Sequence, residues 1–140
     1  MPMADQPADH PTYSAEDLGL KDDLVPCDID PQLVMVDRVH SNRPLDPAKV
    51  GALLKAPEQD RQRHPVLVGV RKSGSSVCVE GQHRITAALL LGDPSVPALV
   101  FPSDGWRTER DVYLAFQSWS AANLPDKPMR LDAPKDDSAG

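Results

Sequence analysis

A glycine, an amide, an imidazole and a guanidinium follow one another near the middle of the chain, as Gly81, Gln82, His83 and Arg84. A segment with alternating apolar residues precedes them, and a segment with helical apolar spacing follows. The first N–H groups of a helix have no intrahelical acceptor, and together with positive side chains they bind anions. The four residues therefore predict an anion-binding corner between a strand and a helix.

The four residues offer different chemistry at such a corner. Gly81 permits a sharp turn and a close approach of a ligand to the main chain. Arg84 presents a planar fork that suits phosphate or carboxylate, and His83 can donate to an oxyanion or act as acid or base. The residues alone leave a structural alternative open, in which Arg84 only forms an ion pair with Glu80 or Asp93.

The elements that must position this corner follow from the hydrophobic pattern, the prolines and the glycines. The expected strands cover 33–39, 65–70, 76–80 and 96–101. The expected helices cover 47–56, 82–91 and 108–122, and 58–64 is an expected loop. Asp46 is the expected N-cap of the first of these helices, and Thr108 begins an expected capping box in the last.

Composition predicts one soluble, cytoplasmic domain. The chain has 140 residues, 15 prolines and a net charge of −6, and it contains no apolar run of the ~20 residues that span a membrane. Residues 1–30 carry eight acids and one base, whereas residues 31–115 carry eleven bases and nine acids. We expect an acidic, proline-rich disordered leader over 1–30, a folded domain over 31–123 and a disordered tail over 124–140. Two cysteines 51 residues apart match no metal motif, and no metal site is expected.

The stretch from Glu80 to Gly92, with a Val-Pro segment after it, resembles the phosphate-binding box of the ParB/sulfiredoxin superfamily. That box reads Gly-x-His/Arg-Arg-x-x-Ala, followed by a helix, a glycine and a Val-Pro strand. Segments 43–50, 65–68 and 110–114 also resemble sulfiredoxin segments, so that the resemblance covers residues 33–116. It implies a small α/β (α+β) domain with a mixed β-sheet and packed helices.

The resemblance also implies a ligand, a nucleotide such as ATP or CTP, with or without Mg²⁺. The positions it assigns to phosphate or nucleotide binding are Arg43, Lys49, Gly81, Gln82, His83 and Arg84. Ala52 and Ala56 replace two hydroxyl residues of the sulfiredoxin helix, which weakens the phosphate cradle.

Three departures from the branches of the superfamily narrow the chemistry expected of this chain. Sulfiredoxins carry their nucleophilic cysteine directly before His-Arg, where this chain has Gln82, and a carboxamide cannot act as a thiolate. Cys78 is expected to be a small core residue. The free-serine kinases of the superfamily carry a catalytic glutamate where Arg43 stands. The ParB partition proteins bind CTP and continue into a helix-turn-helix domain, for which the residues after the last expected helix leave no room.

We therefore expect a domain that binds a nucleotide or other phosphate ligand at the corner. If it is an enzyme, it is a nucleotide-dependent hydrolase or phosphotransferase in which His83 polarises the phosphate and Glu80 acts as base. One alternative is a non-catalytic interaction module with a protein partner. The other is a ParB-like nuclease or DNA-associated regulatory protein, whose basic rim would comprise Arg61, Arg63, Arg71 and Lys72.

Overall fold

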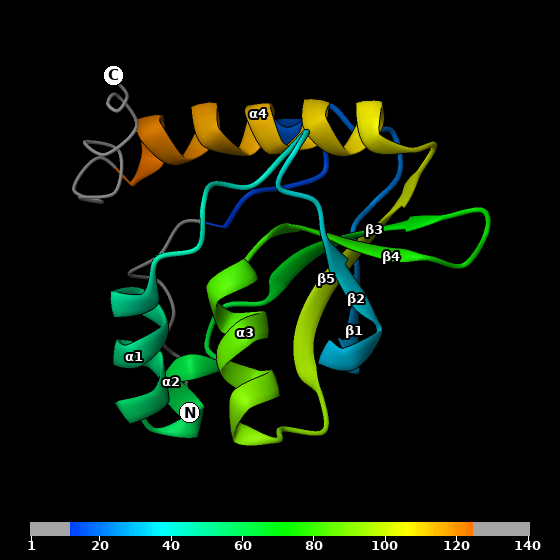
Figure 1. The fold of residues 1–140 in the computed structure, drawn as a ribbon. Helices are drawn as coiled ribbons and strands as arrows, with labels where there is room; N and C mark the ends of the chain where they lie inside the picture. Colours follow the sequence, from blue (N-terminus) through cyan, green and yellow to red (C-terminus); the bar gives the residue numbers. More distant parts are fainter. Residues whose placement is uncertain (1–11, 125–140) are drawn as a thin grey trace, which may run out of the picture.

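The computed structural model describes residues 12–124, which form one mixed β-sheet with helices on both faces (Figure 1). The strands, in the spatial order β1-β5-β3-β4-β2, are β1 (Val25–Ile29), β5 (Val96–Ser103), β3 (Val66–Arg71), β4 (Ser76–Glu80) and β2 (Val34–Val36). β3 pairs antiparallel with β4 and parallel with β5, while the edge strands pair β1 antiparallel to β5 and β2 parallel to β4. The expected mixed sheet with packed helices is confirmed.

Two helical layers enclose this sheet. The helices are η2 (Glu16–Leu18), η3 (Pro31–Leu33), α1 (Pro47–Lys55), α2 (Glu58–Arg61), α3 (Gln82–Leu91) and α4 (Trp106–Asn123). α4 covers one face together with η2, and α3 covers the other with α1 packed beside it (Figure 1). The helix expected over 82–91 and the strand expected over 76–80 have the bounds that the sequence predicts.

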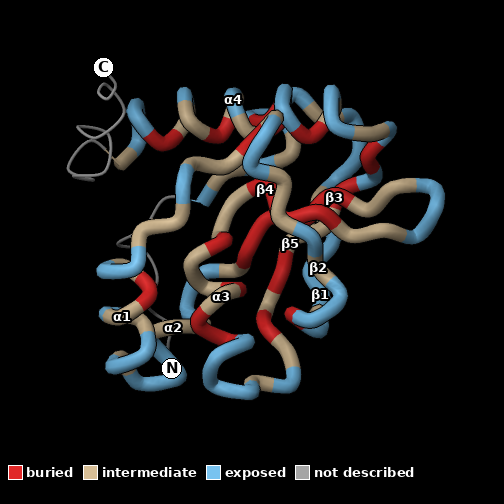
Figure 2. The backbone as a smooth tube through the Cα atoms, viewed as in Figure 1, coloured by how far each residue is buried: buried red, intermediate tan, exposed pale blue. Residues whose placement is uncertain are grey.

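The central strands β3 and β4 are buried on both faces (Figure 2). On the α3 side, Val68 and Cys78 pack against Ile85. On the α4 side, Leu67 and Val79 join a second cluster. Since side chains alternate along a strand, each of these strands contributes to both clusters, and the end of β4 is a rigid base for the corner that follows it.

The first described residues differ from the expectation of disorder over 1–30. Residues 12–30 contain η2 and β1, and Leu18 is buried in the cluster under α4. β1 escaped prediction because it is an edge strand in which four of five residues are exposed, so it has no apolar alternation. Residues 1–11 and 125–140, which hold the rest of the expected leader and tail, lie outside the described residues.

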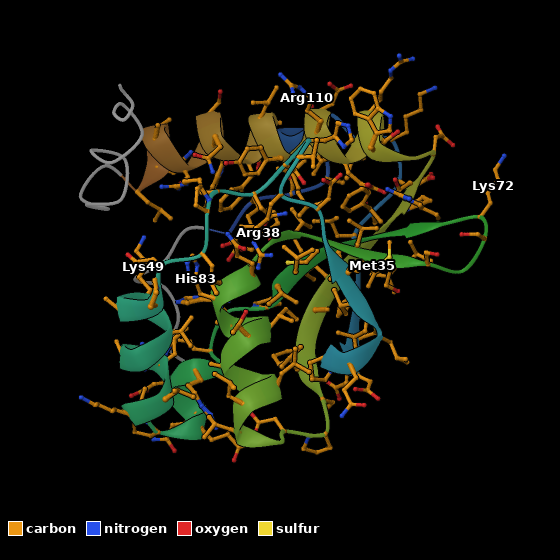
Figure 3. All side chains as sticks on the ribbon, in the orientation of Figure 1. Met35, Arg38, Lys49, Lys72, His83 and Arg110 are labelled. Atoms are coloured by element: carbon orange, nitrogen blue, oxygen red, sulfur yellow. The ribbon has the colours of Figure 1, made fainter. Side chains whose placement is uncertain are left out.

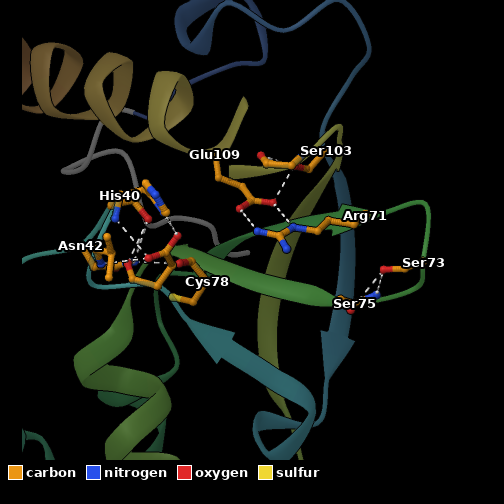
Figure 4. Close-up of polar contacts among 12 residues, drawn as sticks. His40, Asn42, Arg71, Ser73, Ser75, Cys78, Ser103 and Glu109 are labelled. Carbon is orange, nitrogen blue, oxygen red and sulfur yellow. Dashed lines mark hydrogen bonds and ion pairs between the residues drawn. The ribbon is translucent and has the colours of Figure 1, made fainter. Parts of the chain in front are cut away.

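Two local expectations were wrong. Residues 58–61 form the short helix α2 instead of a loop. α4 begins at Trp106 with Gly105 as N-cap, so that Thr108 begins no capping box. For α4, the reason is a tertiary contact in its first turn. Glu109 is fully buried there and accepts two hydrogen bonds from the guanidinium of Arg71, at 2.8 and 2.7 Å (Figure 4).

Candidate functional site

The corner begins with a turn at Gly81 that only glycine can make. Its φ is 109°, in the left-handed region, and a Cβ placed there would stand 2.5 Å from Cγ1 of Val66. Val66 is 1% exposed and cannot move aside without disturbing the core. The close packing of the turn on β3 therefore explains the glycine.

The helix that follows, α3, has no acidic side chain in its first turn to neutralise the positive end of its dipole. No side chain of the described residues caps α3, and its first turn holds no acid. In α1, by contrast, the Asp46 carboxylate accepts the Ala48 N–H at 2.9 Å. The N–H groups at the start of α3 carry the positive end of the helix dipole, so this end remains attractive to an anion.

His83 joins the starts of the two helices. Its Nε2 accepts the backbone N–H of Asp46 at 3.0 Å, which places the ring proton on Nδ1 in the neutral form. Burial, followed by the positive charges of Lys49 and Arg43, lowers the pKa of His83 from its ordinary value of 6.5, against the opposing charge of Asp46. The ring is therefore neutral at pH 7 and lies in a positive field.

Lys49 and Arg43 supply that field from the α1 side of the corner. Lys49 is a half-buried residue of the first turns of α1, and Figure 3 shows it beside His83. Arg43 lies in the loop before α1, and its carbonyl accepts from the side-chain amide of Gln82. The structure thus brings Arg43, Lys49 and His83 together at the start of α3, and their role in phosphate binding stays a prediction.

The Gln82 side chain is buried and forms hydrogen bonds with Arg38 and with the Arg43 carbonyl. Its residue is 4% exposed, and its Oε1 accepts from Nε of Arg38 at 2.9 Å. The side chain is thus held between Arg38 and the Arg43 carbonyl. Sequence reasoning missed Arg38, because its link to Gln82 joins positions 44 residues apart.

Arg84 forms an ion pair with Glu80, which is the structural alternative that the sequence left open. Nη2 of Arg84 donates to both carboxylate oxygens of Glu80, at 2.9 and 3.2 Å, while Nη1 donates to the carbonyls of His64 and Pro65. The guanidinium ties the start of α3 to the start of β3. Asp93, the other candidate partner, forms its ion pair with Arg61 instead, at 3.5 Å.

Other candidate residues offer little chemistry. Cys78 is fully buried, and burial raises the pKa of its thiol to about 12, so it is no nucleophile. Within residues 12–124, no three His, Cys, Asp or Glu side chains gather closely enough to hold a metal ion.

No helix within residues 12–124 is long and apolar enough to cross a membrane.

No protein-family model and no curated protein matches the sequence. A solved structure does match: the C-terminally truncated chromosome-partitioning protein ParB from Caulobacter crescentus, complexed with CTP-gamma-S. The TM-score is 0.54 at 17% sequence identity, and the match covers 68% of this chain and 53% of that chain, so this chain spans about half of its length. The chain therefore has a ParB-like α+β fold.

Proposed function

We propose that this domain binds a nucleotide through its phosphates, between the start of α3 and the residues before and within α1. The observation that carries the proposal is the uncapped start of α3 with Lys49 and Arg43 beside it. Burial, together with the charges of these two residues, lowers the pKa of His83. An anion there gains hydrogen bonds from free N–H groups as well as the attraction of both cations. The CTP-gamma-S bound to the ParB of similar fold supports this ligand class.

In this proposal, the N–H groups of residues 82–84 and the Lys49 ammonium hold phosphate oxygens, and the turn at Gly81 lets the ligand approach. His83 contributes Nδ1–H as a donor, because its Nε2 is engaged by Asp46. ATP and CTP, with or without Mg²⁺, are the nucleotides proposed. For hydrolysis or phosphoryl transfer, Glu80 would act as base after leaving its ion pair with Arg84.

The nuclease or DNA-associated alternative receives less support from the surface. Of the four cations in the rim it requires, three are paired with carboxylates: Arg61 with Asp93, Arg63 with Asp60 and Arg71 with Glu109. Such pairs leave little net charge for a DNA backbone, whose binding depends on unpaired Lys and Arg.

Isothermal titration calorimetry with ATP, CTP and GTP, with and without Mg²⁺, tests the proposal. Lys49→Ala is expected to weaken binding about tenfold, the value of one charged hydrogen bond. Lys72→Ala removes the same charge at the distant tip of the β3–β4 hairpin and is expected to bind like wild type (Figure 3). The absence of binding by wild type refutes the proposal, and equal losses in both variants refute the site.

A titration of a labelled DNA duplex at two salt concentrations separates the alternatives. DNA affinity that falls steeply with salt favours the DNA-associated protein. A wild-type protein that binds neither nucleotide nor DNA favours the interaction module.

A further inference from the structure

Arg38 differs from Arg84 because its side-chain partner is uncharged. Its Nε donates to the carboxamide Oε1 of Gln82 at 2.9 Å. Arg84, on the other side of the α3 start, donates instead to the Glu80 carboxylate, which neutralises it. A carboxamide orients a guanidinium without cancelling its charge, so that Arg38 keeps a full positive charge available to a ligand.

The loop that carries Arg38 is held in place from several sides. The Asp37 carboxylate accepts the backbone N–H groups of Val39 and His40, and its Oδ2 lies 2.8 Å from Nδ1 of His40. Asn42 donates to the carbonyl of Asp37 at 3.2 Å (Figure 4). The His40 ring stacks on Trp106 of α4, with the ring centroids 4.0 Å apart. The backbone of Arg38 is therefore fixed before any ligand arrives.

The outer part of the guanidinium is free to bind. Arg38 is an exposed residue, and among the described residues its Nη groups have no hydrogen-bond partner. Figure 3 shows Arg38 beside the start of α3, on the same side of the molecule as His83 and Lys49. Gln82 holds the arginine by Nε alone, which leaves both Nη groups for an anion.

We propose that Arg38 is a further phosphate-binding residue, that Gln82 positions it, and that the site takes a nucleoside di- or triphosphate. This inference rests on the proposed nucleotide function and specifies its ligand class. Arg38, Arg43 and Lys49 bring three positive charges to the start of α3. The carboxylates near them are already engaged: Asp46 caps α1, Glu80 pairs with Arg84 and Asp37 pairs with His40. A monophosphate carries about −2 charge and cannot use all of these groups, whereas a polyphosphate chain spans several of them.

Titrations of wild type with the mono-, di- and triphosphates of cytidine and adenosine test the ligand class. Affinity is expected to rise with the number of phosphates. Arg38→Ala is expected to weaken triphosphate binding at least about tenfold and monophosphate binding by less than about threefold. Arg110→Ala, an exposed arginine on α4, is the matched control and is expected to leave both unchanged (Figure 3).

A double-mutant cycle tests the positioning role of Gln82. Gln82→Met is expected to weaken triphosphate binding more in wild type than in Arg38→Ala, where the loss of its contact with the Arg43 carbonyl is all that remains. A purely structural role would weaken both backgrounds equally and would refute positioning. Arg38→Lys, which keeps the charge but loses the fork, is a second variant and is expected to bind at an intermediate affinity.

The outcomes separate this inference from the function on which it rests. If wild type binds no nucleotide, both fail. If wild type binds triphosphates but Arg38→Ala matches Arg110→Ala, the role of Arg38 fails and nucleotide binding stands. If mono- and triphosphates bind wild type equally, the assigned ligand class fails. Circular-dichroism melts of each variant without ligand verify folding.

Discussion

Gly81→Ala is expected to destabilise the domain strongly, because two separate costs act at this position. The φ of 109° is one that L residues rarely adopt, and such strain costs about 1–3 kcal/mol. The new Cβ would stand 2.5 Å from Cγ1 and 2.9 Å from Cβ of the buried Val66. Overpacking a core costs about 1–3 kcal/mol, so the free energy of unfolding should fall by about 2–6 kcal/mol.

Gly92→Ala is the matched control for backbone strain alone. Gly92 also has a positive φ, 73°, but a Cβ built there meets nothing within 4 Å. Its expected cost is about 1–2 kcal/mol. The difference between the two variants therefore reports the contact of Gly81 with Val66 together with the extra strain of its larger φ. Urea unfolding followed by circular dichroism gives both free energies from the midpoints and slopes.

Val66→Ala in the Gly81→Ala background completes the test. Removing Cγ1 of Val66 relieves the clash, so that the double variant should be more stable than the sum of the single losses predicts, by at least about 1 kcal/mol. Two results together would refute the packing explanation for this glycine. The losses in the free energy of unfolding for Gly81→Ala and Gly92→Ala would agree within about 0.5 kcal/mol, and the effects in the double variant would be additive.

Two further predictions concern titration. Burial acts to raise the pKa of Glu109, but hydrogen bonds from Arg71 and Ser103 outweigh it and hold the pKa below 4.5. The stability it contributes is therefore full above about pH 4.5 and lost as pH falls through the folded pKa. Glu109→Gln should cost about 1.5–3 kcal/mol near neutral pH, because the Arg71 side chain left behind is partly exposed. It should also reduce the dependence of the free energy of unfolding on pH in the acid range; an unchanged dependence would contradict this reasoning. An NMR titration should place the pKa of His83 below 6.5, nearer 6.5 in Lys49→Ala, and higher with phosphate ligand bound; a value that ignores Lys49 would contradict the assigned field.

Local patterns were sufficient for the elements on either side of the corner. The strand over 76–80 and the helix over 82–91 were predictable because alternation, helical spacing and the stop at Gly92 are all encoded within a few residues. The pair between Arg84 and Glu80 was also foreseeable as an alternative, since the two residues stand four positions apart. The candidate site followed from the same short stretch.

Contacts between distant segments were not predictable in this way. Arg38 meets Gln82 because β2 pairs with β4, and neither segment carries a local sign of that pairing. The fully buried Glu109 belongs to the same class: an acid in a first helical turn is typical of a capping or dipole role, and its burial depends on Arg71 of β3. The contacts of charged residues whose partners lie far along the chain were therefore not predicted from the sequence.

The bare start of α3 is a consequence of its packing. An N-cap side chain would satisfy a first-turn N–H and typically adds about 1 kcal/mol, and the chain uses Asp46 to cap α1 and Asp30 to cap η3. α4 lacks a capping side chain but has the acidic Glu109 in its first turn. Of the helices described in residues 12–124, α3 is the one with neither a capping side chain nor an acid in its first turn. Because Val66 excludes any Cβ at Gly81, no residue there can cap α3. The packing that shapes the turn thus also keeps these N–H groups available to an external anion.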